Sequence, residues 1–266
     1  MSVKPGEVHL LKQIANLCLD RIIFNLQGAT AKTHEKITRT GGSFDSVINT
    51  IKIAKSFGLW VGVHFVPMKP NYKEFIAVAN LCRELQVDEL AVLRFVSQGR
   101  GKISKYLLEL SKDEFKELLR DIIQSKKAYE NLLQIRTGCP MNFCSMIDES
   151  IRPVHCKAGL STLLISFDGK TVPCPAFKQA QPFDLGNVYH DSLINIWENN
   201  NILNHLRNLE YASIKGCDSC RYIDYCQGRC MAQRFYEYGD IQQGPDPLCP
   251  SINRERQKEE LKVYAV

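Results

Sequence analysis

The stretch Cys217-Asp-Ser-Cys220-Arg-Tyr-Ile-Asp-Tyr-Cys226-Gln-Gly-Arg-Cys230 brings four cysteines together at spacings of two, five and three residues. Three more cysteines lie in the same half of the chain, at Cys156, Cys174 and Cys249. Thiolates are soft ligands that suit zinc and iron–sulfur clusters, and packing alone rarely needs so many of them. These seven thiols could supply one complete four-cysteine metal site and most of a second. The sequence therefore indicates a protein that binds metal.

Composition limits the other classes. The 266 residues carry a net charge of +5 that is spread along the chain, so we expect no nucleic-acid partner. No apolar run reaches the roughly 18 residues of a membrane span, and the N-terminus lacks the apolar core of a signal peptide. We therefore expect no membrane association and a cytoplasmic protein with reduced thiols. Eleven cysteines, an odd number, favour metal ligation over disulfides.

Outside the cysteines, the first part of the chain alternates between helical and strand patterns. Short apolar runs predict strands over residues 21–26, 59–66, 89–96 and 132–136. Apolar residues at three- and four-residue steps predict helices over 7–19, 44–57 and 71–86, and another helix beginning at 113. Ser43 is the expected N-cap of the second helix, and Gly58 its expected stop. This alternation predicts an α/β fold with a parallel sheet or barrel.

The barrel is expected to be incomplete. Only four strands precede the cysteines, whereas a closed parallel barrel or doubly wound sheet usually has more. The pattern also starts with a helix that a strand should precede. We assign residues 1–140 to this partial barrel, 141–252 to a small cysteine-rich α+β domain, and 253–266 to a charged tail.

Two elements are expected inside the cysteine-rich domain. Asp168-Gly169 is a strong turn signal, so residues 163–174 should form a hairpin with Cys174 at its end. Residues 191–209 should form a helix whose apolar side includes Ile194, Trp197 and Leu206. From the spacing alone, paired thiols such as Cys217 and Cys220 fit a zinc site as well as an iron–sulfur site.

The order Cys156-x12-Gly169-x4-Cys174, Cys217-x2-Cys220-x5-Cys226-x3-Cys230 and Cys249 resembles the seven-cysteine signature of SPASM domains. These domains are the C-terminal auxiliary-cluster modules of radical S-adenosylmethionine (SAM) enzymes. The flanking text is similar too, including the ending Asp246-Pro-Leu-Cys249-Pro. One departure is Gly228-Arg229, where the family usually has a glycine pair. The resemblance favours [4Fe–4S] clusters over zinc.

The N-terminal part resembles the partial β/α barrel of the same family. Ile22-Ile-Phe-Asn-Leu-Gln-Gly28 and Arg39-Thr-Gly-Gly-Ser-Phe44 are similar to a barrel strand and its loop, and Gln98-Gly-Arg-Gly101 to a later strand end. The family's Cys-x3-Cys-x2-Cys triplet and its Gly-Gly-Glu-Pro-type motif are both absent from these 266 residues. The resemblance places both upstream of Met1. We therefore expect this polypeptide not to cleave SAM by itself, and SAM to be a cofactor only together with that missing part.

The resemblance also implies two ligand sets. One [4Fe–4S] cluster would be held by Cys217, Cys220, Cys226 and Cys249, and the other by Cys156, Cys174 and Cys230. Cys144 or Cys139 could supply the missing fourth thiolate; without it, one iron would be open to substrate or water. Cys18 and Cys82 are isolated on predicted helices, and we expect them to be core thiols.

The implied function is that of a radical SAM/SPASM oxidoreductase or maturase acting on a peptide or on a cofactor or haem precursor. Its auxiliary clusters would relay electrons, to an electron-transfer partner for example, or engage the substrate. Two alternatives remain: a non-catalytic iron–sulfur electron-transfer protein and a zinc-ribbon interaction protein.

Four further features carry weaker expectations. Asn25 and His64 either face a cofactor cavity or belong to the strand core. Gly99-Arg-Gly101 is either an anion cradle or a plain turn. His155 is either a donor beside Cys156 or an exposed loop residue, and Trp197 should pack within the cysteine-rich domain.

Overall fold

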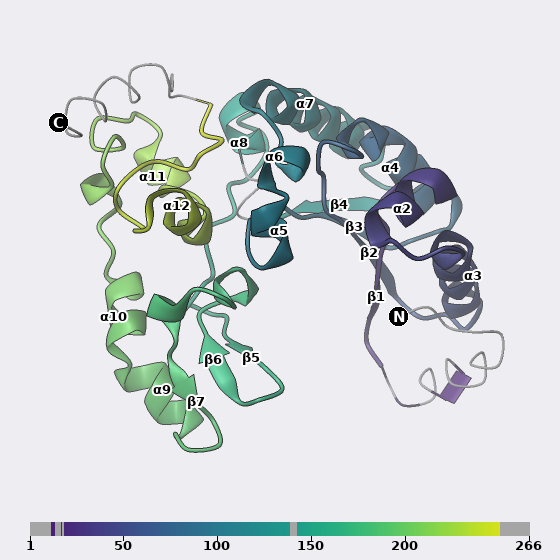
Figure 1. Ribbon diagram of the computed structural model, residues 1–266. Coiled ribbons are helices and arrows are strands. Elements are labelled where there is room, and N and C mark those ends of the chain that lie inside the picture. The colour runs from purple at the N-terminus through teal and green to yellow at the C-terminus, as the bar shows by residue number, and fades with distance from the viewer. Residues whose placement is uncertain (1–11, 14–16, 18, 139–142, 251–266) are drawn as a thin grey trace.

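The computed structural model describes residues 12–13, 17, 19–138 and 143–250. The helix expected over 7–19 lies largely outside these ranges, and the tail 253–266 lies entirely outside them. We call residues 19–138 the sheet region and residues 143–250 the cysteine-rich region. Figure 1 shows both regions with their elements labelled.

The sheet region is built on four parallel strands in the order β1-β2-β3-β4. Their bounds are β1 Ile22–Asn25, β2 Val61–Phe65, β3 Glu89–Val92 and β4 Gln134–Thr137. All four were predicted from apolar runs, and they pair side by side, with Phe24 opposite Val63 for example. Strand β3 ends earlier than expected because the chain leaves the sheet after Leu93, whose N–H still bonds the Phe65 carbonyl at 2.8 Å. The predicted α/β class is confirmed, with a four-stranded parallel sheet that is open in the described residues, as a partial barrel requires.

Helices cover one face of this sheet (Figure 1). They are α2 Ala31–Thr38, α3 Ser43–Ser56, the short 3-10 turn η2 Tyr72–Glu74 with α4 Phe75–Glu84, and α7 Lys112–Ala128. Ile51 of α3, Phe75 of α4 and Leu118 of α7 are fully buried in one core with Val63 and Leu90 of the strands. The three- and four-residue spacing of apolar residues in the sequence places them on one side of each helix, and this side is buried against the sheet.

Helix α3 corrects one prediction. Gly42, with φ of 72°, is its N-cap and gives no side-chain capping bond. Ser43 is instead the first helical residue, and its hydroxyl donates to the Thr40 carbonyl at 2.7 Å. That bond keeps the hydroxyl away from the helix N–H groups, so Ser43 is not the cap. The stop is as predicted, since α3 ends at Ser56 and Gly58 is left-handed.

The opposite face of the sheet is polar and only partly covered. Because parallel partners share a face, Asn25 of β1, His64 of β2, Ala91 of β3 and Arg136 of β4 lie in one row. Asn25 is exposed and His64 is half-buried. Both thus lie on the face away from the helices, which favours the cavity expectation over a place in the strand core.

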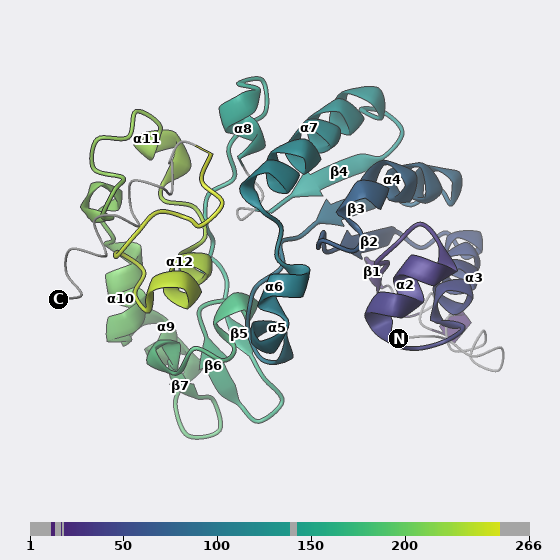
Figure 2. The same cartoon turned by 45° about the horizontal axis from the view of Figure 1, so that its top comes forward.

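Two short helices of the sheet region lie against the cysteine-rich region, α5 Arg100–Ile103 and α6 Lys105–Leu108. Figure 1 and Figure 2 both show them between the two regions. Gly99 precedes α5 with a positive φ of 55°, and a side chain there would meet Gln179. The glycine-rich stretch therefore starts a short helix packed on the cysteine-rich region, in keeping with the plain-turn alternative.

The cysteine-rich region consists of short elements. Its strands form an antiparallel three-stranded sheet of β5 Leu164–Ile165, β6 Lys170–Val172 and β7 Gly186–Asn187. Its helices and 3-10 turns are α8 Cys144–Ile147, η4 Pro175–Phe177, η5 Gln181–Phe183, α9 Leu193–Asn199, α10 Asn201–Arg207, η6 Tyr211–Ser213, α11 Ile223–Cys226 and α12 Met231–Tyr238. No described helix has both the length and the apolar character needed to cross a membrane.

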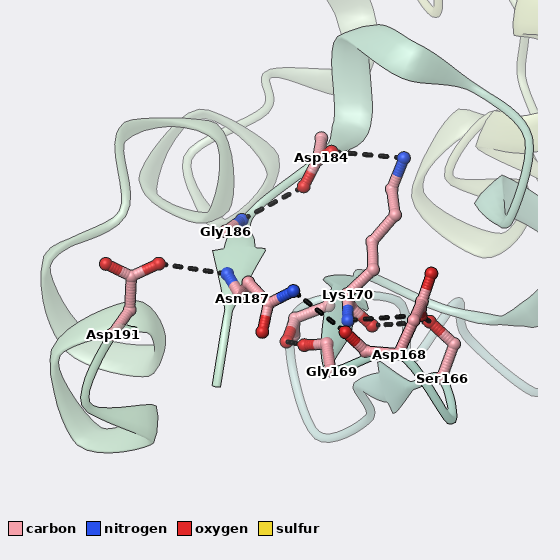
Figure 3. Close-up of polar contacts among 9 residues, drawn as sticks. Ser166, Asp168, Gly169, Lys170, Asp184, Gly186, Asn187 and Asp191 are labelled. Carbon is pink, nitrogen blue, oxygen red and sulfur yellow. Dashed lines mark hydrogen bonds and ion pairs between the residues drawn. The ribbon is translucent and has the colours of Figure 1, made fainter. Parts of the chain in front are cut away.

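The predicted hairpin is confirmed, and its turn is tightly bonded (Figure 3). Gly169 adopts φ of 81°, as an Asp-Gly turn requires. The Ser166 hydroxyl donates to the Asp168 carboxylate at 2.6 Å, and Asn187 of β7 donates to the Asp168 carbonyl at 2.9 Å. The Lys170–Asp184 ion pair, at 3.0 Å, lies on the same side. The polar groups in Figure 3 thus stabilise the three-stranded sheet.

The helix predicted over 191–209 is in fact two helices. The side chain of Asn200 accepts the N–H groups of Ile202 and Leu203, which caps α10 and interrupts the run. The break changes which residues face inward: Ile196, Leu203 and Leu206 are buried, whereas Ile194 is 69% exposed. The prediction that Ile194 lies on the apolar side was therefore wrong. Trp197 packs partly against this small core, as expected.

Candidate metal centre

The seven cysteines of the C-terminal half fall into two groups, and in the structure each is a thiol. We call Cys156, Cys174 and Cys230 set I, and Cys217, Cys220, Cys226 and Cys249 set II. Cys217, Cys230 and Cys249 are buried, and the remaining four are partly buried.

Set II is assembled from three short segments. Cys217 and Cys220 share one turn, in which the Cys220 N–H bonds the Cys217 carbonyl at 3.1 Å. Cys226 is the last residue of α11, and Cys249 follows a turn closed by its N–H on the Asp246 carbonyl at 2.8 Å. Burial raises the pKa of Cys217 to about 12, and the neighbouring thiols of Cys226, Cys249 and Cys220 contribute to the increase. The structure therefore brings all four members together.

Set I forms around the hairpin and the start of α12. Burial raises the pKa of Cys230 to about 12, with Cys156 as the next contributor. Burial also raises the pKa of Cys174 to about 11; N–H groups of Ala176 and Phe177 oppose this and Cys156 adds to it. Cys156 is thus a neighbour of both other members. Backbone N–H bonds to sulfur at Cys174 are of the kind that tune iron–sulfur clusters.

The loop between the sets is conformationally unusual. Gln227, Gly228 and Arg229 all have positive φ, between 51° and 65°. A side chain on Gly228 would collide with Arg234 and Ile214, so that position accepts only glycine. Arg229 holds the left-handed conformation without being glycine, at a cost of about 1–2 kcal/mol. The departure from a glycine pair noted in the sequence is therefore accommodated at some strain.

The two sets differ in what surrounds them. Cys226 and Cys249 of set II pack against the core of the sheet region. All of set I packs instead in the core of the cysteine-rich region, with Phe177 and Met231. Set II thus lies where the two regions meet.

A buried ion pair fastens this junction. Arg94, just after β3, donates from Nη1 to both carboxylate oxygens of Asp246 at 2.7 Å, and both side chains are almost fully buried. The same carboxylate accepts the Leu248 N–H at 3.0 Å. The pair therefore positions the turn that carries Cys249. Sequence reasoning missed it, because nothing local links residues 152 positions apart.

The donor set fits iron–sulfur clusters. Among the residues that the structure describes, no three His, Cys, Asp or Glu side chains converge on a single metal ion. A cubane cluster spreads its ligands over four iron atoms, whereas zinc gathers them at one point. Neighbouring thiols buried in two groups therefore suit clusters, and these thiols would lose their protons on binding iron.

The other cysteines divide as follows. Cys144 lies fully buried in the core of the sheet region, and burial raises its pKa to about 11. The structure groups it with that core and not with set I, so it does not support Cys144 as the fourth ligand. Cys82 is fully buried, which confirms it as a core thiol. Cys18 and Cys139 lie outside the described residues.

The polar face of the sheet holds groups that the sequence did not single out. Glu89 is 5% exposed and pairs with Arg136 at 2.9 Å. Burial, followed by the charge of Arg136, lowers the pKa of His64, so this imidazole is neutral at pH 7. The only sequence signal was a charged residue inside each of two short strands. His155 is exposed beside Cys156, as the loop alternative expects.

Comparison with known proteins gives the class. Residues 156–221 match the family model of the SPASM iron–sulfur cluster-binding domain. This range includes Cys156, Cys174, Cys217 and Cys220. Residues 156–221 are therefore similar to a domain that binds iron–sulfur clusters.

Two curated relatives extend the match toward the N-terminus. The AdoMet-dependent heme synthase of Methanosarcina barkeri is 24% identical over 248 residues, covering 87% of this chain and 67% of its own length. The mycofactocin maturase MftC of Mycobacterium tuberculosis is 29% identical over 247 residues, covering 87% of this chain and 59% of its own length. The chain thus spans well under two thirds of MftC.

Solved structures agree in fold. Streptococcus suis SuiB bound to its precursor peptide SuiA matches with a TM-score of 0.69 at 19% identity, over 93% of this chain and 56% of SuiB. A structure of anSMEcpe with bound AdoMet matches with a TM-score of 0.65 at 15% identity, over 97% of this chain and 66% of anSMEcpe. The resemblance to radical SAM enzymes with a C-terminal SPASM domain is confirmed. So is the prediction of a maturase-like iron–sulfur protein.

Proposed function

We propose that this chain is the cluster-bearing portion of a radical SAM maturase and holds two auxiliary [4Fe–4S] clusters. Set II would provide four thiolates to one cluster. Set I would provide three to the other and leave one iron for a further ligand, for which Cys139 remains a candidate. The observation that carries the proposal is the grouping of Cys217 with Cys226 and Cys249, separate from Cys156 with Cys174 and Cys230.

When bound, such clusters supply one-electron redox chemistry. The chain's own residues then have definable tasks. The thiolates ligate, backbone N–H groups at Ala176 and Phe177 bond the Cys174 sulfur, and the surrounding apolar cores exclude water. The Arg94–Asp246 pair holds the set II loop against the end of β3. Cys226 and Cys249 of set II would thus hold their cluster beside the core of the sheet region.

The substrate class we propose is a peptide, with a haem precursor as the second possibility. MftC is a maturase, SuiB is known with a precursor peptide, and the Methanosarcina relative is a heme synthase. The polar sheet face with Asn25, His64 and Arg136 is the proposed side for SAM and substrate. We keep the domain limits 1–140, 141–252 and 253–266 as part of this proposal, together with a cytoplasmic location in which thiols stay reduced.

Anaerobic purification followed by iron, zinc and acid-labile sulfide analysis tests the cluster assignment. Two [4Fe–4S] clusters predict about eight irons and about eight sulfides per chain. About two zinc ions per chain without sulfide would establish the zinc-ribbon alternative instead.

A second assay separates a maturase from a plain electron carrier. Any form of the protein that carries an upstream Cys-x3-Cys-x2-Cys triplet, reduced with dithionite and supplied with SAM, should release deoxyadenosine if it is a maturase. Full cluster occupancy without any deoxyadenosine would support the non-catalytic electron-transfer protein. The present 266 residues, which contain no Cys-x3-Cys-x2-Cys triplet, are the matched control and should release none.

A further inference from the structure

Arg234 is a buried cation between the two thiol sets. It lies on α12, four positions after Cys230, and its side chain is 0% exposed. Arginine is almost never fully buried unless it is paired, and its guanidinium stays charged in proteins. Such a residue needs a compensating partner, and its surroundings indicate which partner that is.

Backbone acceptors hold two of its three nitrogens in place. Nε donates to the Ile241 carbonyl at 2.6 Å, and Nη1 donates to the Gly228 carbonyl. Gly228 belongs to the loop that links Cys226 of set II to Cys230 of set I, and a side chain there would overlap this guanidinium. The guanidinium is therefore held against the loop that connects Cys226 of set II with Cys230 of set I.

The third nitrogen, Nη2, is buried and has no hydrogen-bond partner among the described residues. A buried donor left without an acceptor is costly, so its acceptor is expected to be something bound at the site. Asp246, the carboxylate whose charge acts most strongly on Arg234, is already paired with Arg94 at 2.7 Å. The other acidic groups near Arg234 are the thiols of Cys230 and Cys156 of set I and of Cys217 of set II, which become anionic when they ligate a cluster.

We propose that Arg234 is a positioning residue shared by both clusters, with its free Nη2–H directed to a sulfur of a bound cluster and its charge raising the reduction potentials of both. This inference rests on the proposed function, because it requires clusters in the two sets. A ligated cluster is an anion overall and becomes more negative when it takes up an electron. A fixed cation nearby therefore stabilises the reduced form, and hydrogen bonds to sulfur act in the same direction.

The test is an anaerobic redox titration of the 266-residue protein, followed by EPR of the reduced clusters. R234Q removes the charge but keeps a polar side chain, and R234K keeps the charge. In R234Q, the equilibrium constant for one-electron reduction of each cluster should fall at least tenfold, which lowers each midpoint potential by about 59 mV or more. In R234K, both reduction equilibrium constants should stay within threefold of the wild-type values.

R207Q is the matched control. Arg207 also donates from Nε to a backbone carbonyl, that of Gly159 at 3.0 Å, and it too has a buried Nη2 without a partner among the described residues. Its guanidinium lies over the Trp197 ring at 4.4 Å, in the small core of α9 and α10. The R207Q potentials should match those of the wild type. Equal potentials in R234Q and R207Q, with iron and sulfide at wild-type levels, would overturn the inference.

Two further outcomes are decisive. If the wild type contains no iron–sulfur cluster, the proposed function fails, and the inference fails with it for that identifiable reason. If R234Q does not bind clusters, the R234K variant decides the question. A tenfold fall in its reduction equilibrium constants overturns the inference, and unchanged potentials support it. If R234K also fails to load, ENDOR of wild-type protein carrying nitrogen-15 arginine decides, because a nitrogen coupling to a reduced cluster supports the inference and its absence overturns it.

Discussion

The sheet region and the cysteine-rich region are built on different physical bases. The first buries one continuous apolar face of four parallel strands under α3, α4 and α7. The second has strands of two or three residues, two small cores, and buried thiols whose pKa values burial raises. The first region is therefore stabilised mainly by hydrophobic burial, whereas the second places most of its buried cysteines among short elements and small cores. The junction between them combines the buried ion pair of Arg94 and Asp246 with apolar contacts of Leu248 and Cys249.

Removing the clusters should produce the largest difference between the regions. Chelation under anaerobic conditions is expected to lower the amide protection of β6 and α12 roughly hundredfold or more, since metal binding energy is folding energy in small metal domains. Protection in β2 and β3 should largely remain, because their core is built mainly from apolar side chains of the strands and helices, and only Cys226 and Cys249 of the proposed cluster ligands pack in or against it. Hydrogen exchange with mass spectrometry measures both. Equal loss in the two regions would mean that the sheet region also depends on the clusters.

Breaking the buried ion pair should have the next largest effect. Asp246→Asn leaves the Arg94 charge buried without a full partner, which should cost about 3–5 kcal/mol in chemical denaturation and loosen Cys249. Glu237→Gln is the control, because its pair with Lys105, at 2.8 Å, also joins the regions but is about one quarter exposed. That substitution should cost about 0–1 kcal/mol. Comparable losses of stability in both variants would show that the buried pair of Asp246 contributes no more than an exposed one.

A cavity in the sheet core should be felt mainly within the sheet region. Leu118→Ala removes a fully buried side chain of α7 and is expected to lower the free energy of unfolding by about 2–5 kcal/mol. Iron content should stay at the wild-type level, because Leu118 lies in the sheet-region core. Ile103→Ala, at a side chain that is 86% exposed, should change stability by less than about 0.5 kcal/mol. Loss of iron in Leu118→Ala would show that the two regions do not behave separately.

The smallest expected effect is a pH dependence from His34 of α2. His34 is 1% exposed, accepts the Gln27 N–H on Nδ1 at 3.1 Å, and lies edge-on to Phe44. Burial lowers its pKa below 6.5, opposed by Glu35. The unfolded chain then binds a proton more readily, so this contribution is complete above pH 6.5 and is lost as pH falls through the folded-state pKa. Denaturation of wild type and His34→Gln at pH 7.5 and at pH 5.5 should show a smaller acid loss in the variant, and an equal loss would exclude His34.

Much of the fold could be predicted because its determinants are local. A buried parallel strand is a short apolar run, so all four strands were identified, and Asp168-Gly169 was sufficient for the hairpin. Competing side-chain bonds defeated two predictions. Ser43 bonds the Thr40 carbonyl instead of capping α3, and Asn200 divides the helix expected over 191–209.

The site was predictable only in its ligands. The order and spacing of the cysteines resemble those of a known family, and this resemblance predicted the two sets. Residues that are far apart in the sequence left no local pattern. Arg94 and Asp246 form an ion pair although they are 152 positions apart. Arg234 has the sequence context of an ordinary arginine on a helix surface. Charges of this kind are apparent only when burial and partners are known.

The central claim is that sets I and II hold separate clusters, and paired cysteine variants test it most directly. Iron and acid-labile sulfide, with EPR of the reduced protein, should be measured for wild type, Cys174→Ala of set I and Cys217→Ala of set II. Each variant is expected to keep about four of about eight irons, and the remaining EPR signals should differ between the two variants. Loss of all iron from both variants, or the same residual signal in both, would contradict two separate sites.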